Sequence, residues 1–107
     1  MQKSETIILL FRIFKFKKTK TKKGMITEDK IRETCMTDPE SGFRMLVEKF
    51  QSPMYWHIRR MIVSHDDAED VLQETFIKIF RHLDDFRAES SLSTWIYRIA
   101  TNECIRF

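Results

Sequence analysis

The sequence has few of the residues that interrupt helices. Its 107 residues include two glycines and two prolines, too few for the many tight turns of a β-sandwich or barrel. The scarcity therefore favours long helices. Charged residues make up 33% of the chain and apolar residues 42%, a balance typical of one globular domain.

Cysteine is also scarce. Cys35 and Cys104 form no CxxC or Cys/His pattern, so we expect reduced thiols in a cytoplasmic protein rather than a disulfide or a metal site. His57, His65 and His82 lack metal-ligand spacing and are interpreted as surface or hydrogen-bonded residues. With no nucleophile–base pair and no phosphate-binding loop in the sequence, we predict no enzymatic activity and no cofactor.

The net charge of +3 conceals two segments of opposite sign. Residues 1–24 contain eight Lys/Arg and one Glu, whereas residues 25–107 contain eleven Lys/Arg and fifteen Asp/Glu. The basic isoelectric point therefore belongs to the first segment. We predict a basic leader over 1–24, disordered or loosely helical and outside the fold, and an acidic helical domain over 25–107.

The leader contains the apolar run Thr6–Phe16, which Arg12 interrupts. A membrane span needs about 20 apolar residues, so no stable membrane insertion is expected. Lysines follow the run, whereas in a signal peptide they precede it. Three interpretations remain: an untidy leader translated from a start upstream of Met25, a basic amphipathic segment that contacts lipid or nucleic acid, or a nuclear signal, which the rest of the sequence disfavours.

Hydrophobic periodicity predicts the first helices of the domain. A short helix is expected over Thr27–Met36 with Thr27 as N-cap, followed by a break over Thr37–Gly42. A longer helical segment is expected over Phe43–Val63, and Pro53 predicts a kink or two abutting helices within it. Its apolar positions are Phe43, Leu46, Val47, Phe50, Met54, Ile58, Met61 and Ile62.

Asp66–Leu83 is the most regular predicted helix, with Asp66 as N-cap and Glu69 completing a capping-box pair. Its expected core stripe is Ala68, Val71, Leu72, Phe76, Ile79, Phe80 and Leu83. A second stripe is Asp70, Gln73, Glu74, Ile77 and, at its edge, Lys78. An isoleucine among acidic and amide groups is typical of a docking face. A solvated face with one exposed isoleucine is the alternative.

A polar loop, Asp84–Ser93 with Phe86 as anchor, leads to a last helix that begins near Ser91 or Ser93. The loop could surround one extruded base. The inward residues of the helix are expected to be Trp95, Ile96, Ile99, Ala100 and Cys104. The outward residues are Thr94, Tyr97, Arg98, Thr101, Asn102 and Arg106. Arginine and hydroxyl groups suit phosphates, and amides and aromatic rings suit unpaired bases, although an ordinary polar face remains the alternative.

The string "DAEDVLQETFIKIFRHLDDFRAESSLSTWIYRIATNECIRF" resembles region two of bacterial sigma factors of the extracytoplasmic-function (ECF) group. That family's pattern of D-A-E-D, Q-E-x-F, F-R, a Ser-rich loop and T-W-(L/I)-Y-R-I-A-x-N occurs here in order. Phe43–Ile62 resemble the preceding helix pair, including the mid-helix proline. The resemblance covers roughly Phe43–Phe107 and implies an all-α fold, a compact bundle of three to four helices.

The resemblance implies a cytoplasmic transcription initiation domain. It would bind the Arg-rich clamp coiled coil of the largest RNA polymerase subunit, through Asp70, Gln73, Glu74 and Ile77. It would also recognise and melt the promoter minus-ten element, and by motif position it would hold one strand through Ser90, Ser91, Tyr97, Arg98 and Asn102. The outward residues Thr94, Thr101 and Arg106 of the last helix complete the predicted DNA-binding set. An anti-sigma factor is a further expected partner.

Region four, the second helical domain of such factors, is not among these 107 residues. We therefore expect this chain to bind the clamp but to support initiation poorly. An excised domain, a truncated gene product and an incomplete reading frame are all left open. The alternative function is a helical interaction domain, a truncated decoy or an anti-sigma-like protein, that does not read DNA.

Overall fold

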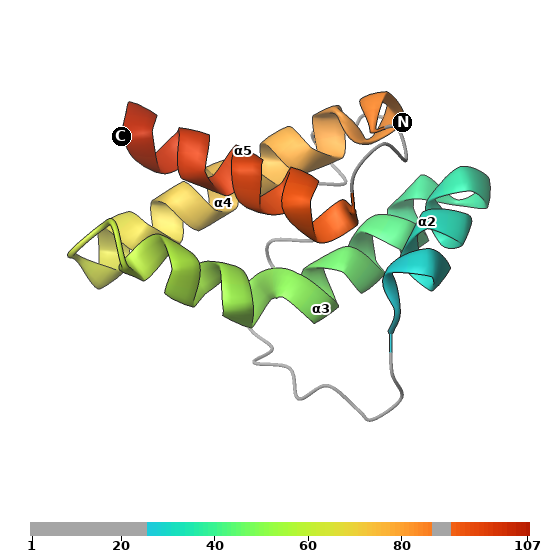
Figure 1. Cartoon of the computed structure of the whole chain (residues 1–107), viewed down its shortest axis with the longest axis horizontal. Helices are drawn as coiled ribbons and strands as arrows, with labels where there is room; N and C mark the ends of the chain where they lie inside the picture. Colours follow the sequence, from blue (N-terminus) through green and yellow to red (C-terminus); the bar gives the residue numbers. More distant parts are fainter. Residues whose placement is uncertain (1–25, 87–90) are drawn as a thin grey trace. The chain divides into compact units, whose positions relative to one another are not determined.

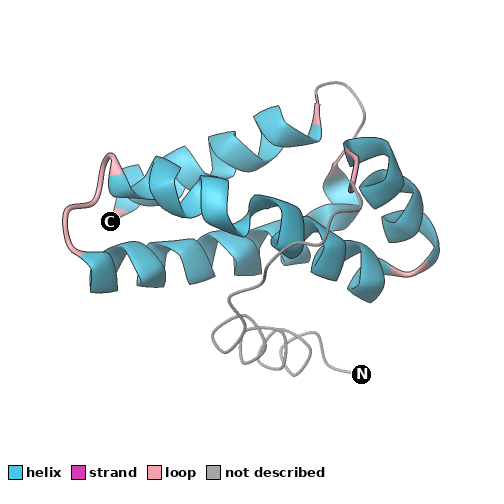
Figure 2. Cartoon of the chain, turned by 90° about the horizontal axis from the view of Figure 1, so that it is seen from below, coloured by secondary structure: helices cyan, strands magenta, loops and turns pink. Residues whose placement is uncertain are grey.

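The computed structural model describes residues 26–86 and 91–107. In these ranges the chain forms four α-helices and one short 3₁₀ helix, and no strand (Figure 2). The all-α prediction is therefore confirmed. The predicted leader and Ser90 lie outside the described residues, so the boundary between residues 24 and 25 stays a prediction. The chain divides into two units, Met1–Lys49 and Phe50–Phe107, which are described separately.

In the first unit, helix α2 covers Glu28–Thr37 (Figure 1). Its N-cap is Thr27, as predicted, and the Thr27 hydroxyl accepts a hydrogen bond from the Lys30 N–H at 3.1 Å. Gly42, on the following helix, lies against α2. A Cβ atom there would meet Cys35 Sγ and would come within 2.7 Å of Cys35 Cα. The absence of a side chain at Gly42 thus permits this close approach.

The predicted break over Thr37–Gly42 is wrong, because a single residue, Asp38, separates α2 from α3 (Pro39–Arg59). Proline suits the first helical turn, where its missing N–H would have no partner in any case. The Asp38 carboxylate accepts hydrogen bonds from the Ser41 hydroxyl at 2.8 Å and the Ser41 N–H at 3.4 Å. These bonds lower the pKa of Asp38.

Helix α3 runs without interruption through Pro53, so the prediction of two abutting helices is wrong. Pro53 is exposed. The helix also ends at Arg59 and not at Val63. Met61, which the periodicity placed among the apolar helical positions, lies beyond this end and is 45% exposed.

In the second unit, helix α4 covers His65–Arg81. Its N-cap is Ser64 rather than the predicted Asp66, and the Ser64 hydroxyl accepts from the Asp67 N–H at 3.2 Å. The helix therefore begins two residues earlier than it would with Asp66 as its N-cap. Asp66 lies inside the first turn, where its negative charge still suits the helix dipole. The predicted partner Glu69 instead lies 3.6 Å from His65 Nε2.

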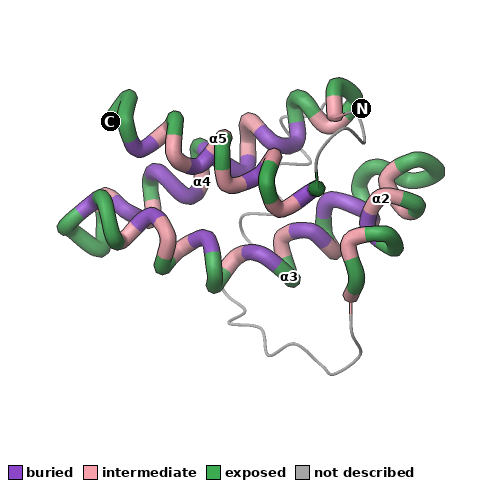
Figure 3. The backbone as a smooth tube through the Cα atoms, viewed as in Figure 1, coloured by how far each residue is buried: buried purple, intermediate pink, exposed green. Residues whose placement is uncertain are grey.

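Helices α4 and α5 (Leu92–Arg106) lie side by side and run in opposite directions (Figure 1). Buried positions recur along both helices (Figure 3). The buried residues are Ala68, Val71, Leu72, Thr75, Phe76, Ile79 and Phe80 on α4, and Leu92, Ile96, Ala100 and Cys104 on α5. The predicted stripes are confirmed in the main, although Leu83, Trp95 and Ile99 are half-buried. The buried hydroxyl of Thr75 donates to the Val71 carbonyl at 2.7 Å, which satisfies it.

Between these two helices, a 3₁₀ helix (η1) covers Leu83–Asp85. Phe86 follows it and is half-buried, with its ring centroid 5.0 Å from that of Trp95. This contact agrees with the prediction that Phe86 anchors the loop. The last helix begins after Ser91, which is its N-cap.

His57, in the C-terminal half of α3, contacts two residues of α5. His57 Nε2 lies 3.0 Å from Thr101 Oγ1, and the His57 ring meets the Tyr97 ring at a centroid distance of 5.0 Å. Burial of the imidazole, with a smaller contribution from the Arg60 charge, lowers the pKa of His57 below its usual value of 6.5. The imidazole is therefore neutral at pH 7.

The lowered pKa of His57 predicts a loss of stability in mild acid. The unfolded chain binds this proton more tightly than the folded chain, so unfolding becomes more favourable as the pH falls below about 6.5 and the loss levels off below the folded pKa. Urea midpoints at pH 7.5 and pH 5.5 should therefore differ more for the unmodified chain than for His57→Gln. The other two histidines are common to both proteins. Equal pH dependence in the two would contradict this assignment.

Candidate functional site

The predicted docking stripe lies on the solvent side of α4. Asp70 and Glu74 are exposed, and Gln73 and Ile77 are half-buried. We call these four residues the acidic face. Asp70 and Glu74 are one helical turn apart, so their side chains neighbour each other. Neither carboxylate forms an ion pair with another described residue.

Two cations close to the acidic face in sequence or in space, Lys78 and Arg106, pair with another residue. Lys78 Nζ lies 3.0 Å from Glu103 Oε2 on α5, and Arg106 lies 4.0 Å from the same oxygen. The Glu103 side chain is only 11% exposed. Glu103 thus holds both cations, and the carboxylates of Asp70 and Glu74 remain available to a partner.

A shallow hollow of about 270 Å³ lies where the acidic face meets the end of α5. It is lined by Asp70, Val71, Glu74, Glu103, Arg106 and Phe107. Arg106, which the sequence pattern grouped with the outward residues of the last helix, therefore lies beside two residues of the acidic face. Glu103 was not predicted as a site residue, because its pairing with Lys78 depends on how α4 and α5 pack.

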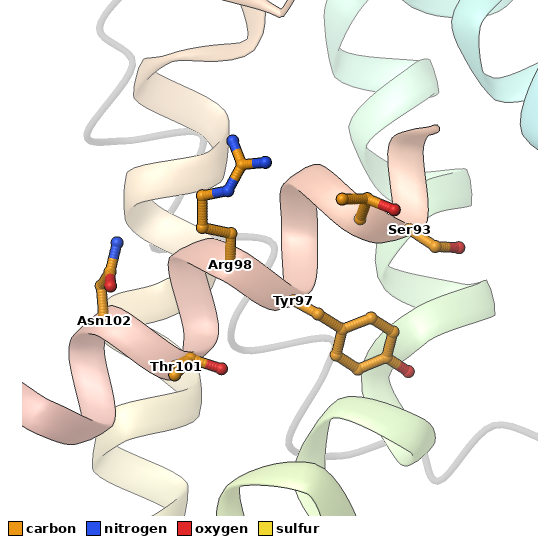
Figure 4. A pocket seen from close by; sticks show the side chains of 6 residues that line it. Ser93, Tyr97, Arg98, Thr101 and Asn102 are labelled. Atoms are coloured by element: carbon orange, nitrogen blue, oxygen red, sulfur yellow. The ribbon is translucent and has the colours of Figure 1, made fainter. Parts of the chain in front are cut away.

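A second hollow, of about 450 Å³, lies on α5. It brings together five residues of the predicted nucleic-acid set, Thr94, Tyr97, Arg98, Thr101 and Asn102, with the additional residue Ser93. We call it the α5 hollow. Figure 4 shows Tyr97 and Thr101 on one side of the helix and Arg98 and Asn102 on the other. Helical spacing alone places these residues on one broad outward face.

Three polar groups of the α5 hollow have no hydrogen bond or ion pair with another described residue. They are the Arg98 guanidinium, the Asn102 amide and the Tyr97 hydroxyl. Arg98 and Asn102 are exposed. Burial raises the pKa of Tyr97, so its hydroxyl is a protonated donor at neutral pH. The hollow therefore offers a cation, an amide and a phenol to a ligand.

The remaining hydroxyls near the hollow already have partners. The Ser91 hydroxyl caps α5 by accepting from the Thr94 N–H at 3.1 Å, and it donates to Thr94 Oγ1 at 2.9 Å. Thr101 pairs with His57. Of the two serines predicted to hold an extruded base, Ser91 is thus engaged in the cap, and Ser90 lies outside the described residues.

Residues 26–86 and 91–107 lack the features of two other kinds of site. No group of three or more His, Cys, Asp or Glu side chains there could hold a metal ion. No helix in the same ranges is long and apolar enough to cross a membrane. Cys35 and Cys104 are free thiols, and burial raises the pKa of each.

Comparison with known proteins shows which family this chain resembles. The family model described as "Sigma-70 region 2" matches residues 46–107. The "ECF RNA polymerase sigma-E factor" of Haemophilus influenzae is 38% identical over 77 residues, which cover 72% of this chain and 40% of that protein. The proteins of the same name from Salmonella typhimurium and Escherichia coli match with the same identity and coverage.

The chain thus spans 40% of the length of these curated relatives. The matched segment contains α4, α5 and most of α3, and it includes both the acidic face and the α5 hollow. The family match covers more than half of the chain. The predicted assignment to region two of the ECF group is confirmed, and the chain belongs to the Sigma-70 region 2 family.

Proposed function

We propose that this chain acts in transcription initiation by binding the clamp coiled coil of RNA polymerase with its acidic face and a melted minus-ten strand with its α5 hollow. The observation that carries the proposal is that unpaired groups of opposite charge lie on two different helices. Asp70 and Glu74 are unpaired acids on α4, and Arg98 is an unpaired cation on α5, among the described residues. The names of the relatives include RNA polymerase, which supports the choice of partner.

The acidic face has the chemistry to bind an arginine-rich helix. Carboxylates form strong, often bidentate hydrogen bonds with guanidinium groups. Gln73 adds an amide, and half-buried Ile77 adds apolar area at the same face. Asp70 and Glu74 form no ion pair with another described residue. An arginine of a partner can therefore bind them without breaking an ion pair among these residues.

The α5 hollow has the chemistry to bind unpaired nucleotides. Arg98 can bind phosphate, Asn102 can hydrogen-bond to a base edge, and the Tyr97 ring can stack on a base. A single strand suits this site because the bases must leave the stack before an aromatic ring can reach them. Residues 25–107 contain more acidic than basic side chains, which weakens their own attraction to DNA. Polymerase would therefore supply much of the attraction to promoter DNA. The cytoplasm, where such a complex works, is the proposed location, and an anti-sigma factor remains a proposed partner.

Glu74→Lys should weaken binding to an isolated clamp coiled-coil fragment at least roughly tenfold, since a hydrogen bond to a charged group contributes about 1.5 to 3 kcal/mol. Isothermal titration calorimetry with the full chain measures this. Glu48→Lys is the matched control, because Glu48 is exposed on α3 and the change in net charge is identical. Equal affinities of the two variants would contradict docking through the acidic face.

Arg98→Ala and Asn102→Ala should each weaken binding to single-stranded DNA without altering clamp binding. Loss of one phosphate contact should lower the slope of log K against log salt concentration by about 0.7 for Arg98→Ala. Asn102→Ala should lower affinity about fivefold and leave this slope unchanged. Fluorescence anisotropy of a labelled oligonucleotide measures both effects.

Arg81→Ala is the control for these two variants, because Arg81 is exposed at the end of α4 and does not line the α5 hollow. It should bind single-stranded DNA like the unmodified chain. If Arg81→Ala weakened DNA binding as much as Arg98→Ala, the binding would depend on the net charge of the protein, and the α5 hollow would not be the specific site. Clamp binding without any DNA binding would favour a helical interaction domain that does not read DNA.

A further inference from the structure

One residue from outside α5 contacts two residues of the α5 hollow. His57 Nε2 lies 3.0 Å from Thr101 Oγ1. The His57 ring also meets the Tyr97 ring edge-on, with centroids 5.0 Å apart and planes inclined at 69°. Phe50 makes a second edge-on contact with Tyr97, at 6.4 Å and 83°. Phe50 and His57 are seven residues apart, which places them on the same face of α3. Two rings of α3 therefore hold the Tyr97 ring.

We propose that His57 is a positioning residue of the α5 hollow, which orients the Tyr97 ring and the Thr101 hydroxyl for contact with unpaired nucleotides. The inference rests on the proposed function of that hollow. Arg98 and Asn102 lie on the other side of α5 (Figure 4). His57 thus acts on the nucleotide contacts of Tyr97 and Thr101 and not on the phosphate contact of Arg98.

Orientation before binding has a direct effect on affinity. A free aromatic side chain loses rotamer freedom when a ligand fixes it, and a ring that is already held avoids that loss. The Thr101 hydroxyl has one proton and two lone pairs, so its hydrogen bond to His57 determines which of them faces the hollow. The His57 ring is neutral at pH 7. It therefore orients Tyr97 and Thr101 through packing and a hydrogen bond, and not through a positive charge.

A residue that merely filled space between α3 and α5 would show a different pattern. Its loss would lower the stability of the whole unit, and the fraction of molecules that still folded would bind DNA normally. A positioning residue instead changes DNA affinity in the folded protein. The contacts of His57 with Thr101 and Tyr97 do not involve the acidic face, so clamp binding reports on folding independently.

The experiment uses the full chain, a labelled single-stranded oligonucleotide of mixed sequence, and the variants His57→Phe, Thr101→Val and the double variant. His57→Phe keeps a ring against Tyr97 but removes the hydrogen bond. It should weaken DNA binding about fivefold, the equivalent of one hydrogen bond, with an unchanged salt slope and unchanged clamp affinity. The double variant should bind no more weakly than the weaker single variant, because both remove the same interaction.

His57→Gln provides the rescue, since its amide can reach the Thr101 hydroxyl, and its affinity should exceed that of His57→Phe. If His57→Phe did not fold, Thr101→Val would remove the same hydrogen bond from the other side. Normal DNA affinity of a folded His57→Phe, or losses that multiply in the double variant, would overturn the positioning role alone. Failure of the unmodified chain to bind single-stranded DNA, or no effect of Arg98→Ala, would overturn both this inference and the proposed function.

Discussion

The packing of α4 against α5 decides which side chains of the two helices can reach a partner. Ala68 on α4 and Ala100 on α5 are fully buried, and small buried side chains let packed helices approach closely. Once this packing is set, helical periodicity leaves Asp70 and Glu74 on one outer surface and Arg98 and Asn102 on another. Thr75 can join the buried layer because its hydroxyl bonds to its own helix at Val71.

The same packing separates the charges of the unit. Glu103 on α5 is largely buried and holds Lys78 and Arg106. Two cations that could have neutralised the acidic face are therefore held by a third carboxylate. This arrangement keeps the acidic face negative, while Arg98 remains available on the other helix. The proposed division of labour, protein on α4 and nucleic acid on α5, follows from this distribution of charge.

Local pattern was sufficient to predict much of this fold. The apolar spacing of α4 and α5 predicted their buried sides, and Thr27 was recognised as a cap, because both features depend on residues within two turns. The start of α3 was missed because the sequence "TDPESG" resembles a loop, whereas Pro39 and Asp38 together begin a helix. The cap of α4 was misplaced because Ser64 and Asp66 are both good N-cap residues, and only the backbone shows which one is used.

The candidate site was less predictable than the fold. The acidic face and most of the α5 hollow are visible as outward positions of single helices. The position of Arg106 beside Asp70, the pairing of Glu103 with Lys78, and the contact of His57 with Thr101 each join residues that are distant in the sequence. Periodicity says which way a side chain faces along its own helix, but it does not say which helix lies opposite.

The central claim is that two separate faces serve two partners at once. The most direct test measures the affinity of the chain for a labelled single-stranded oligonucleotide, with and without a saturating concentration of the clamp coiled-coil fragment. The account predicts a ternary complex, larger than either binary complex, in which DNA affinity is equal or higher. Displacement of the DNA by the clamp fragment would mean that both partners use one surface, and it would contradict the account.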